Sequence, residues 1–278
     1  MNIITLDAGN NEVKVATAEG VFSFNSFLGE ARDRRLESQY EDEMIGVYNG
    51  MPFFAGELAQ YESEFPRNSM GLSKAHEDAK LRILIALHRY SKHYDNHIVV
   101  GQPIESHKSE EKLRIKAMLA KEHRLVLNGV ERKFYIHNTE VAPEGAAAYW
   151  SLQEELPVVH IVDVGSGTVN IATIRDGQFI DKESFTLPFG AESTKTKDMQ
   201  AMSYGIISAL NRFNRQDSYR IVGGAAEKVK PYLQMQFPDC KVIHPLVKVG
   251  TKVMSVHPKY ATVVGMYHIA KAVYGYEG

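Results

Sequence analysis

The sequence of 278 residues contains one cysteine, one tryptophan and almost no excess of either charge. A single cysteine cannot form an internal disulfide or a thiolate metal cluster, which excludes a disulfide-stapled secreted scaffold. Cys240 is therefore expected to be a small buried residue of a protein in a reducing compartment. The formal net charge of −2 excludes general binding of nucleic acid through charge alone, so any such role needs an adaptor or a local patch.

Long apolar runs are also missing, since none approaches the roughly 20 residues that a membrane-spanning helix needs. The start of the chain, MNIITLDAG, lacks the basic and apolar pattern of an export signal. We therefore expect a cytoplasmic protein without a membrane anchor. The length suits two domains of ordinary size, each with its own core.

Strand and helix patterns alternate along the chain, which predicts an α/β fold. Strands are expected at 2–9, 11–20, 20–29, 96–103, 132–141, 157–167, 168–180 and 239–245, with a hairpin around Asn49-Gly50. Helices are expected at 73–91, 109–123, 143–155, 193–214 and 259–275, and residues 219–234 read as a strand, a glycine turn and a helix. Ser73 is a candidate N-cap, and the charge-rich stretch 31–43 reads as a loop or an exposed helix.

One phrase occurs twice in the chain. LDAGNNEVKVATA begins at Leu6 and VDVGSGTVNIATI begins at Val162, and without a gap the two share Asp, Gly, Val, Ala and Thr at five positions. A strand that ends in Asp-x-Gly and turns back through small residues exposes backbone N–H groups, which suit phosphate oxygens. The acid beside such a turn suits a Mg²⁺ ion that neutralises the phosphates. The repetition predicts two such hairpins, facing each other across a cleft.

Two further segments complete the pattern. In IVGGAAEKV an apolar strand runs into Gly223 and Gly224 before a helix, where the backbone can approach a flat or anionic ligand, although an ordinary turn fits equally. In VAPEGAAAYW, Glu144 is expected at the start of a helix whose three alanines allow close packing between the halves. The alternative is a structural role, because the helix dipole favours an acidic residue in the first turn of a helix.

Taken in order, these segments resemble the actin, Hsp70 and sugar kinase superfamily over nearly the whole chain. LDAGNNEVKV, VAPEGAAAYW and YATVVGMYHIA are most similar to the bacterial plasmid-segregation actins, the ParM and AlfA group, with AlfA the preferred relative. The resemblance implies an actin-like ATPase fold of two ribonuclease H-like halves around a nucleotide cleft. It implies domain I at 1–150 with a small subdomain IB at about 30–75, domain II at 151–260, and a C-terminal helix at 261–278 that returns to domain I.

The resemblance also implies a role for each candidate residue. Asp7 and Asp163 would organise Mg²⁺, and Lys14 would reach the β- and γ-phosphates of ATP. Glu144, with Asp163 the expected catalytic pair, would position the attacking water. The expected phosphate cradle consists of Gly9, Asn10, Asn11, Gly165, Ser166, Gly167 and Thr168. Gly223, Gly224 and Ala225 would lie along the adenosine of ATP or ADP.

Two departures from the relatives matter. Between Phe185 and Gly223 the sequence has room for about one long helix, so subdomain IIB is expected to be missing. The base and ribose would then be poorly covered, which implies weak binding by the monomer or a site completed by a filament neighbour. Asn170 stands where relatives commonly place an acid, so one water-mediated metal contact is in question.

The function implied by the resemblance is an ATP-dependent filament that segregates low-copy plasmid DNA through a small DNA-binding adaptor. Its partners would be copies of itself and the adaptor at a plasmid centromere, without direct nucleic-acid or membrane binding. A monomeric small-molecule kinase of the same superfamily and a nucleotide-binding scaffold are the alternatives. The histidines show no short ligand spacing, and Trp150 is expected in the core.

Overall fold

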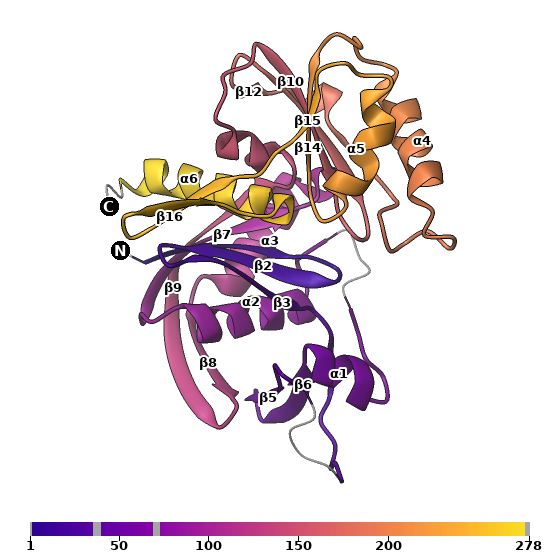
Figure 1. The fold of residues 1–278 in the computed structure, drawn as a ribbon. Coiled ribbons are helices and arrows are strands. Elements are labelled where there is room, and N and C mark those ends of the chain that lie inside the picture. The colour runs from indigo at the N-terminus through magenta and orange to yellow at the C-terminus, as the bar shows by residue number, and fades with distance from the viewer. Residues whose placement is uncertain (1, 36–39, 69–72, 276–278) are drawn as a thin grey trace.

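The computed structural model of the chain describes residues 2–35, 40–68 and 73–275. Its strands form two large β-sheets, which lie one above the other in Figure 1. The last helix, α6 (Ala261–Tyr274), runs between them. We call the nine-stranded sheet with its helices the first lobe and the six-stranded sheet with its helices the second lobe.

The first lobe is built on five strands in the order β3-β2-β1-β7-β9. Their bounds are β1 (Ile3–Ala8), β2 (Glu12–Thr17), β3 (Gly20–Asn25), β7 (Asp95–Gln102) and β9 (Val130–Pro143). β1 is fully buried, and its pattern of apolar residues is that of a central strand covered on both faces. The strand places Asp7 near its C-terminal end, at the edge of the sheet that faces the second lobe.

Four more strands extend this sheet in the order β8-β5-β6-β4. They are β8 (Glu122–Leu127), β5 (Met44–Tyr48), β6 (Met51–Ala55) and β4 (Leu28–Glu30). Asn49 and Gly50 both have positive φ angles of 52° and 78°, as a two-residue hairpin turn requires, so the predicted hairpin is confirmed. The described part of 31–43 contains no helix or strand, and residues 36–39 lie outside the described residues.

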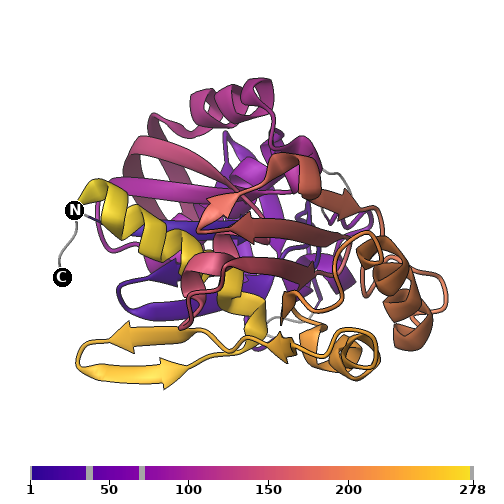
Figure 2. The same ribbon diagram turned by 90° about the horizontal axis from the view of Figure 1, so that it is seen from above.

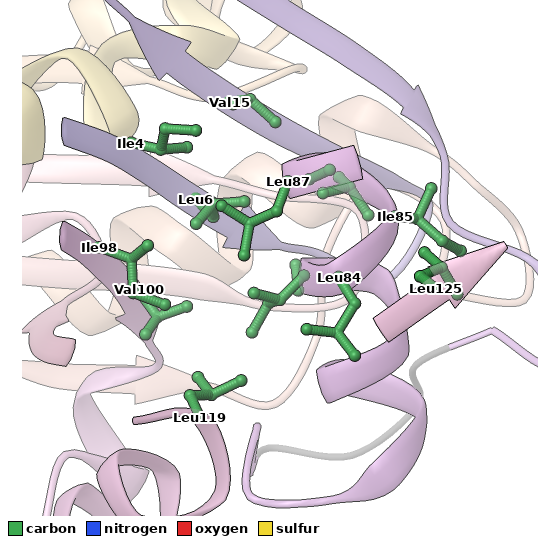
Figure 3. Close-up of a cluster of buried hydrophobic side chains, with 14 of the residues drawn as sticks. Ile4, Leu6, Val15, Leu84, Ile85, Leu87, Ile98, Val100, Leu119 and Leu125 are labelled. Carbon is green, nitrogen blue, oxygen red and sulfur yellow. The ribbon is translucent and has the colours of Figure 1, made fainter. Parts of the chain in front are cut away.

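Three helices belong to the first lobe, α1 (Glu57–Glu62), α2 (Glu77–Tyr90) and α3 (Ser109–Leu119). Figure 3 shows side chains of β1, α2 and β7 meeting in its core, among them Leu6, Leu84 and Val100, all fully buried. The predicted N-cap is wrong, because the His76 side chain accepts the hydrogen bond from the Ala79 N–H. No helix in the described ranges is long and apolar enough to cross a bilayer.

The second lobe has its strands in the order β12-β11-β10-β14-β15, with β13 also paired to β11. The strands are β10 (Val158–Val164), β11 (Val169–Arg175), β12 (Gln178–Phe179), β13 (Phe185–Leu187), β14 (Ser218–Val222) and β15 (Cys240–Val242). Cys240 is buried, as expected. Helices α4 (Met199–Leu210) and α5 (Ala226–Gln234) pack together beside this sheet in Figure 1.

The stretch from 188 to 217, all of it described, contains α4 as its only regular element. The predicted helix at 193–214 is therefore shorter than expected and begins at its N-cap, Asp198, which accepts hydrogen bonds from two backbone N–H groups. A single helix leaves no room for an inserted subdomain at this point of the second lobe. The expectation of a missing subdomain IIB agrees with this arrangement.

The two lobes share one strand connectivity. β1 pairs antiparallel with β2 and parallel with β7, which pairs parallel with β9. β10 pairs antiparallel with β11 and parallel with β14, which pairs parallel with β15. The phrase that occurs twice in the sequence therefore forms the first hairpin of each lobe.

The lobes are joined through two packed segments, α6 and the 3-10 helix η2 (Ala146–Ser151). The helix predicted at 143–155 is wrong in extent and type, because Pro143 still belongs to β9 and Gly145 interrupts the chain with a φ of 77°. Trp150 is also not in the core, since 40% of it is exposed. Figure 2 shows α6 crossing the molecule between the lobes.

Some elements have no counterpart among the sequence predictions. They are α1, β8, β13 and the exposed hairpin of β16 (Leu246–Val249) and β17 (Lys252–Ser255). Short 3-10 turns also occur at Ile104–Ser106, Asp181–Glu183 and Pro258–Tyr260. The C-terminal helix ends at Tyr274, and residues 276–278 of the predicted segment lie outside the described residues.

Candidate nucleotide site

The two echoed hairpins meet tip to tip between the lobes. In the β1–β2 hairpin Asp7 pairs with Lys14, and in the β10–β11 hairpin Asp163 pairs with Asn170. A Cβ atom on Gly167 would lie 1.7 Å from Asn10 Nδ2, so the turn of one hairpin rests on the turn of the other. The repeated turns therefore form the two sides of a narrow space.

That space consists of an inner cavity of about 40 Å³ and an outer cavity of about 740 Å³. Lys14, Gly165 and Ser166 line both, so the two cavities are continuous along these residues. The other predicted residues on the inner cavity are Asp7, Gly9, Asn10, Glu144, Asp163, Gly167 and Thr168. The outer cavity adds Asn11, Gly224 and Ala225.

Gly223 lies just behind this lining. It has a φ of 95°, and a Cβ atom there would approach the Val164 carbonyl oxygen to 2.4 Å and Asp163 Oδ1 to 2.7 Å. Any side chain would strain the backbone and strike the strand that carries Asp163. The structure thus brings all the predicted residues into or directly behind one cleft.

Asp7 and Lys14 form an ion pair inside the cleft, with 2.9 Å between Asp7 Oδ2 and Lys14 Nζ. Burial alone would raise the pKa of Asp7, but Lys14 and Lys74 outweigh it and the pKa lies below its usual value. Asp7 Oδ1 is buried without a hydrogen-bond partner. This carboxylate is therefore ionised, and its Oδ1, which has only the Lys74 ammonium nearby at 3.9 Å, can still bind a ligand.

Lys74 is a site residue that the sequence did not reveal. It is 3% exposed, and its Nζ lies 2.5 Å from the Ala8 carbonyl oxygen, 3.5 Å from Glu144 Oε1 and 3.9 Å from Asp7 Oδ1. Its backbone N–H donates to Gln102 Oε1 at 2.9 Å, which fixes the loop before α2. A buried ammonium needs such partners, because an isolated charge is strongly disfavoured in the interior.

Glu144 follows β9 directly, and its N–H donates to the Gln102 carbonyl at 2.8 Å. Its Oε2 accepts from Asn170 Nδ2 at 3.3 Å, whereas Oε1 is buried without a hydrogen-bond partner. Burial raises the pKa of Glu144 to about 7, helped by Asp7 and Asp163 and opposed by Lys74. A carboxylate with this pKa is suited to take a proton or to orient a water near neutral pH.

Asp163 belongs to the second lobe and lines the same inner cavity as Glu144. Its Oδ2 accepts a hydrogen bond from Thr262 Oγ1 at 2.9 Å. Burial raises its pKa, while Lys14 opposes the shift. Thr262 belongs to α6, so the last helix holds an acid of the second lobe. This contact could not be predicted from the sequence, because Thr262 lies within an ordinary apolar helix pattern.

A magnesium ion fits these residues only in company with other ligands. In the part of the chain that the structure describes, no three His, Cys, Asp or Glu side chains converge as a metal cage. The orphaned Asp7 Oδ1 is a hard oxygen of the kind that Mg²⁺ prefers, and Mg²⁺ usually keeps waters and takes phosphate oxygens. The donor set therefore suits an ion that arrives with a phosphate ligand.

The outer cavity has an unexpected second wall. On the side of the second lobe it is lined by Gly165, Ser166, Ala191, Glu192, Lys197, Gly224, Ala225 and Lys228. The first lobe contributes Asn11, Glu12, Lys14, Asn25, Phe27, Glu57, Gln60 and Asn68. From the sequence we expect a nucleoside to contact only the second lobe, because neither α1 nor the turn before it is predicted.

Comparisons with known proteins show the family of the chain and the solved structures that share its fold. Residues 5–146, slightly more than half of the chain, match the family described as actin-like proteins, N-terminal domain. A search of curated protein sequences found no match. Among solved structures, the AlfA filament from B. subtilis plasmid pLS32 has a TM-score of 0.78 at 21% identity, covering 96% of this chain and 98% of that chain.

Two more structures carry nucleotides in their names. The AlfA filament bound to AMPPNP has a TM-score of 0.76 at 20% identity and covers 98% of both chains. The archaeal actin homolog Ta0583 in complex with ADP has a TM-score of 0.75 at 18% identity, covering 98% of this chain and 100% of that chain. These likenesses confirm the predicted fold class.

Proposed function

The chain belongs to the actin-like proteins, and on that premise we propose that it is a Mg²⁺-dependent ATPase whose filaments segregate low-copy plasmid DNA in the cytoplasm. A small DNA-binding adaptor at the plasmid centromere would couple filament to DNA. Similar structures are filaments by name, and two hold AMPPNP or ADP. The observation that carries the proposal is the convergence of Asp7, Asp163 and Glu144 on one cavity between twin hairpins.

The hairpins would bind the phosphates of ATP through their backbone N–H groups. Gly9 to Asn11 and Ser166 to Thr168 would offer these groups from opposite lobes, and Lys14 adds a positive charge between them. The Gly165 N–H is not available, because it donates to the Thr168 carbonyl at 3.0 Å. Asp7 and Asp163 would hold Mg²⁺, which when bound neutralises the phosphate charge. The triphosphate would therefore bridge the lobes and favour their closure.

Glu144 would position the water that attacks the γ-phosphate and accept its proton. Glu144 lines the cavity between the phosphate hairpins, its Oε1 has no hydrogen-bond partner among the described residues, and its pKa of about 7 allows it to be charged at neutral pH. Lys74 stabilises that charge from the first lobe. Hydrolysis in such a site depends on position, so assembly that rotates the lobes would start it and the ADP state would weaken the filament.

The test is sedimentation and phosphate release with Mg-ATP at tens of micromolar protein. We expect the wild type to pellet and to release phosphate, and Glu144→Ala to pellet while hydrolysing about a hundredfold or more slowly. A wild-type protein that stays in the supernatant with and without adaptor contradicts the filament. Transfer of phosphate to a small molecule without assembly would instead identify a kinase of the superfamily.

A further inference from the structure

Asn170 reaches across the cleft to the proposed catalytic acid. It lies on β11 of the second lobe, is 3% exposed, and donates from Nδ2 to Glu144 Oε2 at 3.3 Å. Glu144 belongs to the first lobe, where it follows β9. The contact therefore joins the two lobes at the residue expected to position the water.

The orientation of this amide is fixed by two donors. Asn170 Oδ1 accepts from Thr186 Oγ1 at 2.7 Å and from the Ile104 N–H at 3.4 Å. The Ile104 N–H can only donate, so the oxygen of the amide must face it, and the Nδ2 group then points the other way, toward Glu144. Gly145 packs closely against Asn170, since a Cβ atom on Gly145 would lie 3.3 Å from Asn170 Cβ. The carboxamide thus has one orientation that satisfies its neighbours.

The internal duplication shows what is special about this position. Asn170 pairs with Asp163 as Lys14 pairs with Asp7, so Asn170 is the counterpart of Lys14 in the second hairpin. Lys14 donates to the acid of its own hairpin. Asn170 instead donates to an acid of the other lobe. Lys14 therefore stabilises the charge of Asp7 within one hairpin, whereas Asn170, at the equivalent position of the other hairpin, makes a contact between the lobes.

We propose that Asn170 is the positioning residue that holds the Glu144 carboxylate in its working orientation and makes hydrolysis depend on closure of the lobes. The proposal rests on the proposed ATPase function. The amide occupies Oε2, while Oε1 lies 3.5 Å from Lys74 Nζ without a hydrogen bond and can accept one from a water. Lys74 lies on the same lobe as Glu144 and moves with it, whereas Asn170 moves with the second lobe.

The variant Asn170→Asp tests this role, because it keeps the shape of the side chain but replaces the donor with an acceptor. Thr186 and Ile104 can still donate to the new carboxylate. We expect phosphate release per protomer in Mg-ATP filaments to fall about tenfold or more, as the loss of a hydrogen bond to a charged group implies. The new carboxylate also adds negative charge beside the phosphate hairpins, so this variant should bind ATP more weakly. Asn170→Ala removes the donor without adding charge, and its Kd for ATP and critical concentration for assembly should stay within about twofold of the wild type.

A double-mutant cycle with Glu144→Ala separates positioning from a general structural role. If Asn170 acts through Glu144, then Asn170→Ala lowers single-turnover hydrolysis in the wild-type background and causes no further loss in the Glu144→Ala background. Thr186→Val, which frees the carboxamide to rotate, should cause a smaller loss in the same direction. Equal losses of Asn170→Ala in both backgrounds overturn the proposal.

Wild-type hydrolysis by Asn170→Asp also overturns it, since an acceptor cannot replace the donor. The proposed ATPase function and the role of Asn170 can be contradicted separately. A wild type that neither assembles nor hydrolyses ATP contradicts the proposed function and this role with it. An active wild type whose Asn170→Asp variant hydrolyses at the same rate contradicts the role of Asn170 alone.

Discussion

Gly265 of α6 lies so close to Ala147 of η2 that a Cβ atom on Gly265 would be 1.8 Å from the Ala147 carbonyl oxygen. The same helix is tied to both lobes. Thr5 of β1 donates its hydroxyl to the Val263 carbonyl at 2.7 Å, and Thr262 donates to Asp163 at 2.9 Å. The crossing of α6 and η2 therefore lies at the point where the first lobe, the second lobe and the nucleotide site are mechanically joined.

Gly265→Ala is expected to destabilise the protein by about 1–3 kcal/mol, as overpacking of a well-packed site does. Alanine gains about 1 kcal/mol over glycine inside a helix, but the added methyl strikes a backbone oxygen that cannot turn away. The clash should outweigh the gain. Urea unfolding of the nucleotide-free protein measures the difference.

Val273→Ala on the same helix is the control, because Val273 is 66% exposed and its replacement should change the free energy of unfolding by no more than about 0.5 kcal/mol. A Gly265→Ala variant as stable as the wild type would show that α6 and η2 can move apart at this crossing without loss of stability.

Gly167→Ala should behave in the opposite way. Its methyl would meet the end of the Asn10 side chain, at 1.7 Å from Nδ2, and that side chain can rotate away. We expect the free energy of unfolding to stay within about 0.5 kcal/mol of the wild type. Affinity for ATP should fall about tenfold, because the displaced Asn10 and the methyl occupy the space between the phosphate hairpins.

Isothermal titration with ATP together with urea unfolding tests this pair of expectations. Unchanged affinity at unchanged stability would mean that the hairpin tips separate widely when the nucleotide binds, so that the Gly167 and Asn10 contact belongs to the empty cleft alone.

The sequence revealed the hairpins because their chemistry is local. A turn is specified within a few residues when Asp, a small residue and Gly follow an apolar strand. Because this pattern occurs at both Asp7 and Asp163, it indicated that the chain contains two related lobes. Lys74 and Thr262 were missed for the reverse reason. Each sits in a segment whose own pattern is ordinary, and its role arises from a partner far along the chain.

The helix predicted at 143–155 is wrong mainly because of the backbone conformation of Gly145. Three alanines favour a helix, but Gly145 takes a φ of 77° so that the chain can turn sharply beside Asn170 and Asp163. The result is a 3-10 helix from Ala146 to Ser151, and Glu144 lies between the end of β9 and the start of this helix. Packing around the cleft thus overrides the helix propensity of the alanines.

His160 predicts a pH dependence of stability in the second lobe. It is fully buried, stacked on Phe213 and hydrogen-bonded to Thr173 at 2.9 Å and Asp217 at 3.0 Å. Burial lowers its pKa below the usual value although Asp217 opposes the shift. The unfolded chain therefore binds a proton that the folded protein refuses, and stability should fall as the pH drops below about 6.5.

His160→Gln removes this titration, so the variant should lose less stability than the wild type between pH 8 and pH 5.5, by at most about 1.4 kcal/mol per pH unit. Urea unfolding of both proteins at the two pH values isolates the histidine, because carboxylates and other histidines contribute equally to each. Parallel losses would show that His160 is protonated without cost in the folded protein.

Lys74→Met tests the charge balance of the nucleotide site. Without this ammonium, the buried Glu144 carboxylate loses its ion-pair partner and Asp7 keeps only Lys14. Removal of one partner from a buried ion pair costs about 3 kcal/mol or more. The cost should appear at pH 8, where Glu144 is ionised. It should be smaller at pH 6, because the pKa of Glu144 is about 7 with Lys74 present and rises without it.

Lys80→Met is the matched control, since Lys80 is also a buried lysine but pairs with Glu77, whose side chain is 72% exposed. A half-solvated pair contributes at most about 1 kcal/mol, with no dependence on pH near 7. Thermal unfolding of both variants without nucleotide at pH 6 and pH 8 makes the comparison. If the two lysines cost the same at both pH values, then water reaches Glu144 and Asp7 freely, and the site does not depend on Lys74 to hold their charges.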